Sequence, residues 1–150
     1  MTNNIKIGRI WNIPISLHPS WFLIFGLVTW SLASGYFPLE YPALAPALYW
    51  LLGVLTSLLF FVSVLVHELA HAYVARRSGL PVEGITLFIF GGAAYIGKEP
   101  DSAGAEFRIA AAGPLASLVL AAGFGALFLL DHHIPILAAP SIWLARINLM

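Results

Sequence analysis

The chain has 150 residues, of which 60% are hydrophobic and only 9% are charged, whereas about a quarter of the residues of a soluble domain carry charge. This composition indicates an integral membrane protein that lies in a lipid bilayer. Seven Lys and Arg balance seven Asp and Glu, so nothing in the charge calls for a nucleic-acid partner. Cysteine is absent, which excludes thiolate sites and leaves nitrogen and oxygen to hold any metal.

Long uncharged stretches predict the membrane-spanning helices. Three of them lack any acidic or basic residue: 10–39, 41–67 and 109–130. Each can supply a span of about 20 residues, and in the first stretch the segment "HPSWFLIFGLVTWSLASGYF" is long enough for one somewhat short span. A fourth apolar stretch begins at Ile134 and continues to the last residue. We therefore expect an all-α polytopic membrane protein, with three transmembrane helices and the start of a fourth, in one domain covering residues 1–150.

The cationic residues orient these helices. Lys6 and Arg9 precede the first helix, and a second group lies between the second and third helices: Arg76, Arg77, Lys98 and Arg108. The positive-inside rule then places the N-terminus and residues 76–108 in the cytoplasm, which favours the plasma membrane as the location. A cleaved signal peptide is the alternative for the first span. Against it, "IKIGRIWNIPIS" indicates a short extended segment with a turn at Asn12-Ile13-Pro14.

The segment between the second and third helices is predicted to contain a β-hairpin. Gly79 and Pro81 end the preceding helix. Further on, "ITLFIF" and "AAYIG" flank Gly91-Gly92, a pattern typical of two strands around a glycine turn. Strands this apolar are expected to be membrane-associated, dipping into the bilayer or packing on the helices, with one edge left open.

Two histidines and a glutamate close the second apolar stretch. His67 and His71 are four residues apart, so on a helix they share a face and can reach one ion. Glu68 follows the first histidine directly. In this His-Glu-x-x-His pattern two neutral imidazoles bind Zn²⁺, and the glutamate takes a proton from the zinc-bound water. A shuffled chain with the same five histidines would contain the pattern about 0.005 times.

The alternative for these three residues is that they are satisfied polar groups in a helix bundle. Taking Arg76 as the cytoplasmic boundary puts His67 about 13 Å inside the bilayer. Ionisable side chains at that depth are costly, which favours a functional site. Other histidines lack this spacing: His18 reads as an interfacial polar residue, and His132 and His133 as solvated. Gly113-Pro114 in the third helix is explained by close helix packing.

The chain resembles the site-2 protease family of intramembrane zinc metalloproteases. The segments that carry the resemblance follow the family's order over nearly the whole chain: "IPISLHPSW", "HELAH", "FGGAAYIG" and "EFRIAAAGPLAS". It implies that His67 and His71 are zinc ligands and that Glu68 is the catalytic base. It further implies that an unwound substrate lies near Phe90, Gly91 and Gly92.

The resemblance also implies a third zinc ligand, an aspartate in a Leu-Asp-Gly sequence. No such sequence occurs here, and "ARINLM" resembles the approach to it. We therefore expect the aspartate to follow Met150 and the 150 residues alone to be inactive. Glu106 is the best internal substitute, yet it is expected to lie too close to the interface.

Two classes of function remain. The first is an intramembrane zinc protease that cleaves a transmembrane or membrane-adjacent segment of another protein. The second is a non-catalytic transporter or metal-binding scaffold, whose polar residues line a path. Glu68 distinguishes them, because a transporter needs ligands but not a base beside the first one. Neither the substrate nor the oligomeric state is indicated.

Overall fold

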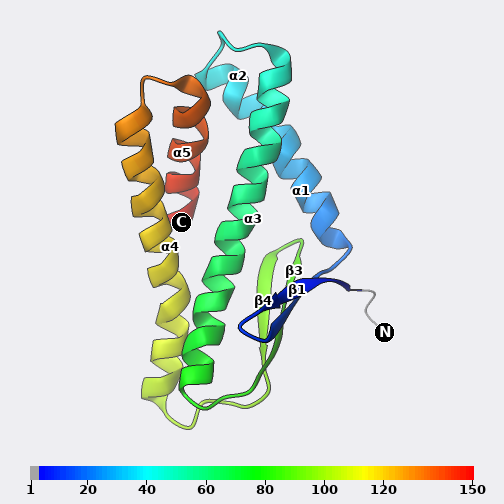
Figure 1. Cartoon of the computed structure of the whole chain (residues 1–150), viewed down its shortest axis with the longest axis vertical. Coiled ribbons are helices and arrows are strands. Elements are labelled where there is room, and N and C mark those ends of the chain that lie inside the picture. The colour runs from blue at the N-terminus through cyan, green and yellow to red at the C-terminus, as the bar shows by residue number, and fades with distance from the viewer. Residues whose placement is uncertain (1–3) are drawn as a thin grey trace. The chain divides into compact units, whose positions relative to one another are not determined.

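The computed structural model describes residues 4–150, apart from the side chain of Asp131. The chain forms two compact units: residues 1–23 with 64–116, and residues 24–63 with 117–150. The elements, shown in Figure 1, follow the order β1 (Ile5–Ile10), β2 (Ile13–Leu17), α1 (Ser20–Ser31), η1 (Leu32–Tyr36), α2 (Phe37–Glu40), α3 (Pro46–Arg77), β3 (Val82–Phe88), β4 (Gly91–Ile96), α4 (Ala103–Asp131) and α5 (Pro135–Asn148). The η1 segment is a π-helical turn between α1 and α2.

Three helical segments of the described chain are long and apolar enough to cross a membrane: Ser20–Glu40, Pro46–Arg77 and Ala103–Leu130. Each of them overlaps one of the three predicted spans. The expected start of a fourth is a helix as well, α5, but its 14 residues are shorter than the roughly 20 needed to cross the hydrocarbon. A fourth span therefore stays a prediction.

The first unit contains a four-stranded sheet in the order β1-β2-β3-β4. β1 and β2 form an antiparallel hairpin, β2 pairs in parallel with β3, and β3 pairs antiparallel with β4. The all-α prediction with one isolated hairpin was therefore too simple, since the N-terminal extended segment completes a sheet. Its turn is Trp11-Asn12, one residue earlier than expected, and both residues have positive φ (50° and 62°), as a two-residue type I′ turn requires.

The sheet packs on the C-terminal part of α3, beside which β3 and β4 lie in Figure 1. Ile13 and Ile85 from the sheet contact Leu69 and Ala72 of the helix in one buried cluster. The burial pattern of β2 alternates along the strand, as expected for a strand with one face on the core. This packing holds the hairpin against the turn of α3 that carries the His-Glu-x-x-His residues.

The predicted stop of α3 is confirmed as a glycine cap. Gly79 has φ +80°, and its N–H donates to the Arg76 carbonyl at 3.0 Å, while the Leu80 N–H donates to the Ala75 carbonyl at 3.0 Å. These two bonds define a Schellman motif. Leu80 and Ala75 also share a buried apolar cluster, the contact that commonly accompanies such a cap.

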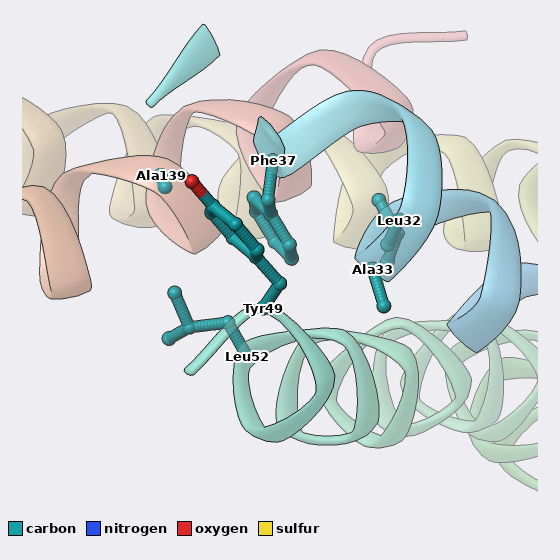
Figure 2. Close-up of a cluster of buried hydrophobic side chains, with 6 residues drawn as sticks. All are labelled: Leu32, Ala33, Phe37, Tyr49, Leu52 and Ala139. Carbon is teal, nitrogen blue, oxygen red and sulfur yellow. The ribbon is translucent and has the colours of Figure 1, made fainter. Parts of the chain in front are cut away.

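The second unit is held by small and aromatic residues. Figure 2 shows its main buried cluster, which consists of Leu32, Ala33, Phe37, Tyr49, Leu52 and Ala139. Gly53 lets α3 approach α1 closely, because a Cβ there would lie 3.0 Å from the Thr29 carbonyl oxygen. The Thr29 hydroxyl donates to the Ser57 hydroxyl at 3.0 Å. Small residues and interhelical hydrogen bonds of this kind are what hold helices together in lipid.

Candidate metal centre

His67 and His71 face each other on one side of α3. Their Nε2 atoms are 3.1 Å apart, and their rings are 4.8 Å apart between centroids, at an interplanar angle of 74°. Both side chains are half-buried. His67 and His71 therefore share one face of α3, as predicted, and their Nε2 atoms are close enough to bind the same ion.

The orientation of His71 is set by a backbone group of α4. Its Nδ1 lies 2.6 Å from the carbonyl oxygen of Ile109. A carbonyl only accepts, so Nδ1 must carry the proton, and the lone pair of the neutral ring is then on Nε2. Pro114 lies inside the same helix and has no N–H to donate to the carbonyl of Ala110. Such a contact orients metal-ligating histidines in other proteins.

Gly113 of α4 lies directly against both imidazoles. A Cβ at this position would overlap the Nε2 atoms of His67 and His71 and would lie 2.6 Å from His71 Cε1. Close helix packing was expected to explain Gly113, and this expectation was incomplete. The glycine keeps open the space immediately in front of the two nitrogens.

Glu68 points toward the hairpin. The backbone N–H of Ala94 in β4 donates to its carboxylate, and the side chain is half-buried. A Cβ on Gly92 would overlap Glu68 Cγ and would lie 3.2 Å from Oε1. The absence of a side chain at Gly92 therefore allows the Glu68 side chain to lie directly against β4.

The strand β4 is at one edge of the sheet. Phe88 pairs with Gly91 across the two-residue connection Ile89-Phe90, so the turn precedes the glycines rather than including them as predicted. In a two-residue hairpin the flanking pair exchanges hydrogen bonds, and the pattern then alternates along the strands. The N–H and C=O groups of Gly92 and Ala94 consequently point away from β3, which agrees with the Ala94 bond to Glu68.

The other predicted residues lie elsewhere. Phe90 is 88% exposed at the hairpin turn. His18 lies two residues before α1, and its Nδ1 accepts from the Ser20 N–H at 3.2 Å. His132 and His133 are exposed, and Glu106 is exposed in the first turn of α4. Over residues 4–150, with the Asp131 side chain left aside, no group of three His, Cys, Asp or Glu side chains is arranged to hold a metal.

The protein thus has three helices of membrane-spanning length, and one of them, α3, carries an imidazole pair with an adjoining carboxylate. The sequence model of peptidase family M50 matches residues 55–143. The chain therefore belongs to peptidase family M50, the site-2 proteases, as the resemblance implied, and it is an integral membrane protein.

Individual relatives agree with this assignment. Two bear the name "Putative zinc metalloprotease": one from Synechocystis is 47% identical over 82% of this chain, and Rip3 from Mycobacterium tuberculosis is 42% identical over 100% of it. The solved structure of a site-2 protease from Methanocaldococcus jannaschii matches 97% of this chain and 62% of its own, with a TM-score of 0.62 and 28% identity. The chain spans 32% and 39% of the lengths of the first two relatives.

Proposed function

We propose that this chain is the core of an intramembrane zinc metalloprotease, which hydrolyses a peptide bond in or near a transmembrane segment of another protein. The observation that carries the proposal is the pair of Nε2 atoms 3.1 Å apart on a membrane-spanning helix, with Glu68 beside the first histidine. The zinc metalloprotease names of two relatives support the same chemistry. The Lys and Arg distribution supports a cytoplasmic N-terminus at the plasma membrane.

The residues present fit a zinc ion. Two nitrogens bound tetrahedrally at 2.0–2.1 Å would lie about 3.3 Å apart, close to the observed separation of the Nε2 atoms. His71 has its lone pair on Nε2, because Nδ1 donates to Ile109. Gly113 leaves open the space that a methyl group would fill. His67 and His71 are thus suited to hold the ion.

Each protein group then has a distinct task. Zinc, when bound, supplies Lewis-acid polarisation of the peptide carbonyl and of the attacking water. Glu68 accepts the proton of that water and can return it to the departing amine. The Ala94 N–H and the backbone of Gly92 hold the carboxylate in place. Because Glu68 does not have to bind the metal, loss of its charge should stop catalysis while leaving the ion in place.

The open edge of β4 is suited to hold the substrate. A helical substrate hides its carbonyls in its own hydrogen bonds, so it must unwind before one can be attacked. Pairing with a strand edge replaces those bonds. The N–H and C=O groups of Gly92 and the C=O group of Ala94 point outward on this edge beside Glu68, whose carboxylate accepts from the Ala94 N–H. The exposed Phe90 at the turn can contact the substrate's apolar side chains.

The third zinc ligand is proposed to come from outside the 150 residues. Catalytic zinc has three protein ligands as a rule, and the described side chains offer two at this site. Glu106 is exposed and is not grouped with the histidines. The family resemblance points to an aspartate, so the 150-residue chain by itself is proposed to be inactive.

Zinc content and cleavage test the site separately. In the purified full-length protein, His67→Ala or His71→Ala should remove most of the zinc measured by metal analysis, because a ligand is lost. Glu68→Gln should keep the zinc and slow cleavage by about 10²- to 10⁴-fold, the usual contribution of a general base.

The exposed His132 provides the matched control, since His132→Ala removes an imidazole outside the site. Normal zinc content in both His67→Ala and His71→Ala would disprove the metal site. Normal cleavage by Glu68→Gln with zinc present would favour a binding scaffold over a hydrolase.

A further inference from the structure

A pocket lies at the C-terminal end of α3, and its lining includes none of the His-Glu-x-x-His residues. Its volume is about 390 Å³, and it is lined by Trp11, Ile13, Tyr73, Arg76 and Arg77. All of these residues belong to the first unit of the chain. The pocket is thus lined by two guanidinium groups and two aromatic rings. In a chain with only seven Lys and Arg residues, two cations in one pocket suggest that it binds an anion.

The guanidinium groups are held by neutral partners. Arg76 Nη1 donates to the carbonyl oxygen of Trp11 in the β1–β2 turn. Arg77 Nε donates to the Tyr73 hydroxyl at 3.1 Å, and its guanidinium carbon lies 5.4 Å from the centre of the Tyr73 ring. The Trp11 and Tyr73 rings are 5.5 Å apart. Each guanidinium has five N–H donors, so these contacts orient the groups and leave most donors available.

The arginines are not needed to cap the helix. The Schellman motif already supplies backbone donors to the carbonyls of Ala75 and Arg76, from Leu80 and Gly79 respectively. Among the described residues the one salt bridge joins Lys98 and Asp101, so neither Arg76 nor Arg77 is neutralised by a carboxylate there. Two positive charges thus line a pocket whose described lining residues carry no negative charge.

The position of the pocket indicates what supplies the negative charge. α3 has 32 residues and is about 48 Å long, more than the hydrocarbon thickness of about 30 Å. Its last turn, which carries both arginines, is therefore expected at the headgroup level. Trp11 and Tyr73 are 61% and 44% exposed beside it, and exposed Trp and Tyr are typical of that level. Basic pockets on the cytoplasmic side of membrane proteins suit anionic headgroups.

We propose that this pocket binds the phosphate of an anionic membrane lipid. Arg76 and Arg77 bind the phosphate oxygens, a geometry for which the planar guanidinium is suited. Trp11, Ile13 and Tyr73 contact the glycerol and the upper part of the acyl chains. Because Arg76 is bonded to Trp11 and Arg77 to Tyr73, the lipid would join the β1–β2 turn to the end of α3, independently of whether the protein is a protease.

Lipid titration tests this site. The purified full-length protein in neutral detergent is titrated with dioleoyl phosphatidylglycerol, and bound lipid is counted by native mass spectrometry. In two parallel experiments, dioleoyl phosphatidylcholine replaces the phosphatidylglycerol, and inorganic phosphate is added as a competitor. Phosphatidylglycerol should bind about tenfold more tightly than phosphatidylcholine, and Arg76→Gln or Arg77→Gln should each weaken it about tenfold, as expected for loss of one charge-assisted contact. Inorganic phosphate should not displace the lipid, because it lacks the apolar contacts.

Arg108 offers the matched control, because Arg108→Gln removes the same charge from the same unit outside the pocket. Binding should be unchanged in that variant. Equal weakening by Arg108→Gln, equal affinity for phosphatidylcholine, or displacement by inorganic phosphate would each overturn the proposal. If a glutamine variant does not fold, Arg76→Lys and Arg77→Lys keep the charge and lose the planar group. Their affinity should still fall relative to Arg108→Lys, and no fall would contradict the site.

Discussion

The residues around the histidine pair differ in how far sequence could predict them. His67, Glu68 and His71 lie within about one turn of a helix, where spacing alone decides which side chains meet. The contacts of Ile109 and Gly113 come from another helix, and the Ile109 carbonyl reaches His71 across 38 residues of sequence. Nothing local marks these contacts beyond a Gly-Pro pair in an apolar helix, which fits plain packing equally well.

Gly113 provides a prediction at the residue scale. Gly113→Ala should lower zinc affinity by about 10- to 100-fold, the range seen when groups behind metal ligands are altered, because the methyl group overlaps both Nε2 atoms. The helix itself should not weaken, since alanine is favoured over glycine in a helix by about 1 kcal/mol. Competition with a zinc chelator measures the affinity.

Gly123→Ala is the matched control, because it lies in the same helix and no atom is within 4 Å of an added Cβ. It should keep the normal zinc affinity. An unchanged affinity in Gly113→Ala would mean that the glycine serves packing alone.

At the scale of elements, the strands were predicted in part. β3 and β4 were predicted from two apolar segments that flank a glycine pair, although the turn is Ile89-Phe90 and both glycines belong to β4. The parallel pairing of Ile15 with Ile85 was not foreseen. A parallel pair joins distant segments and leaves no turn signal between them. The β1–β2 turn was misplaced because Trp11 is not a usual residue for positive φ.

The open edge of β4 makes a prediction about substrates. A model peptide that the full-length protein cleaves at one bond is prepared with single N-methyl groups at successive positions around that bond. Only alternate N–H groups of an extended substrate face the strand that it pairs with. Methylation of those should slow cleavage by about five- to tenfold each, the value of one hydrogen bond, while the intervening positions are tolerated. Peptides that are methylated at the intervening positions are the internal control. If the cleavage rate does not alternate with the position of the N-methyl group, strand pairing is contradicted.

For the whole molecule, the gaps between charged residues predicted the spans well. An uncharged stretch of the right length has few conformations other than a helix in lipid, because its backbone N–H and C=O groups must be paired within the segment. The second span extends farther than its uncharged stretch, since α3 continues through the histidines to Arg77. At about 48 Å the helix is longer than the hydrocarbon is thick, so this one element is long enough to hold the histidine pair within a bilayer and Arg76 and Arg77 at its surface.

The connections between the three spans make the last prediction. The positive-inside rule places the connection between β4 and α4 in the cytoplasm, and the α2–α3 and α4–α5 connections on the other side. Residues 1–150 contain no cysteine, so Glu99→Cys, Ala43→Cys and His133→Cys each add one exposed thiol to a different connection. In intact cells a membrane-impermeant maleimide should label positions 43 and 133, and position 99 only after permeabilisation. The unsubstituted chain gives the background. Labelling of positions 99 and 133 from the same side would contradict a crossing by α4, and labelling of positions 43 and 99 from the same side would contradict one by α3.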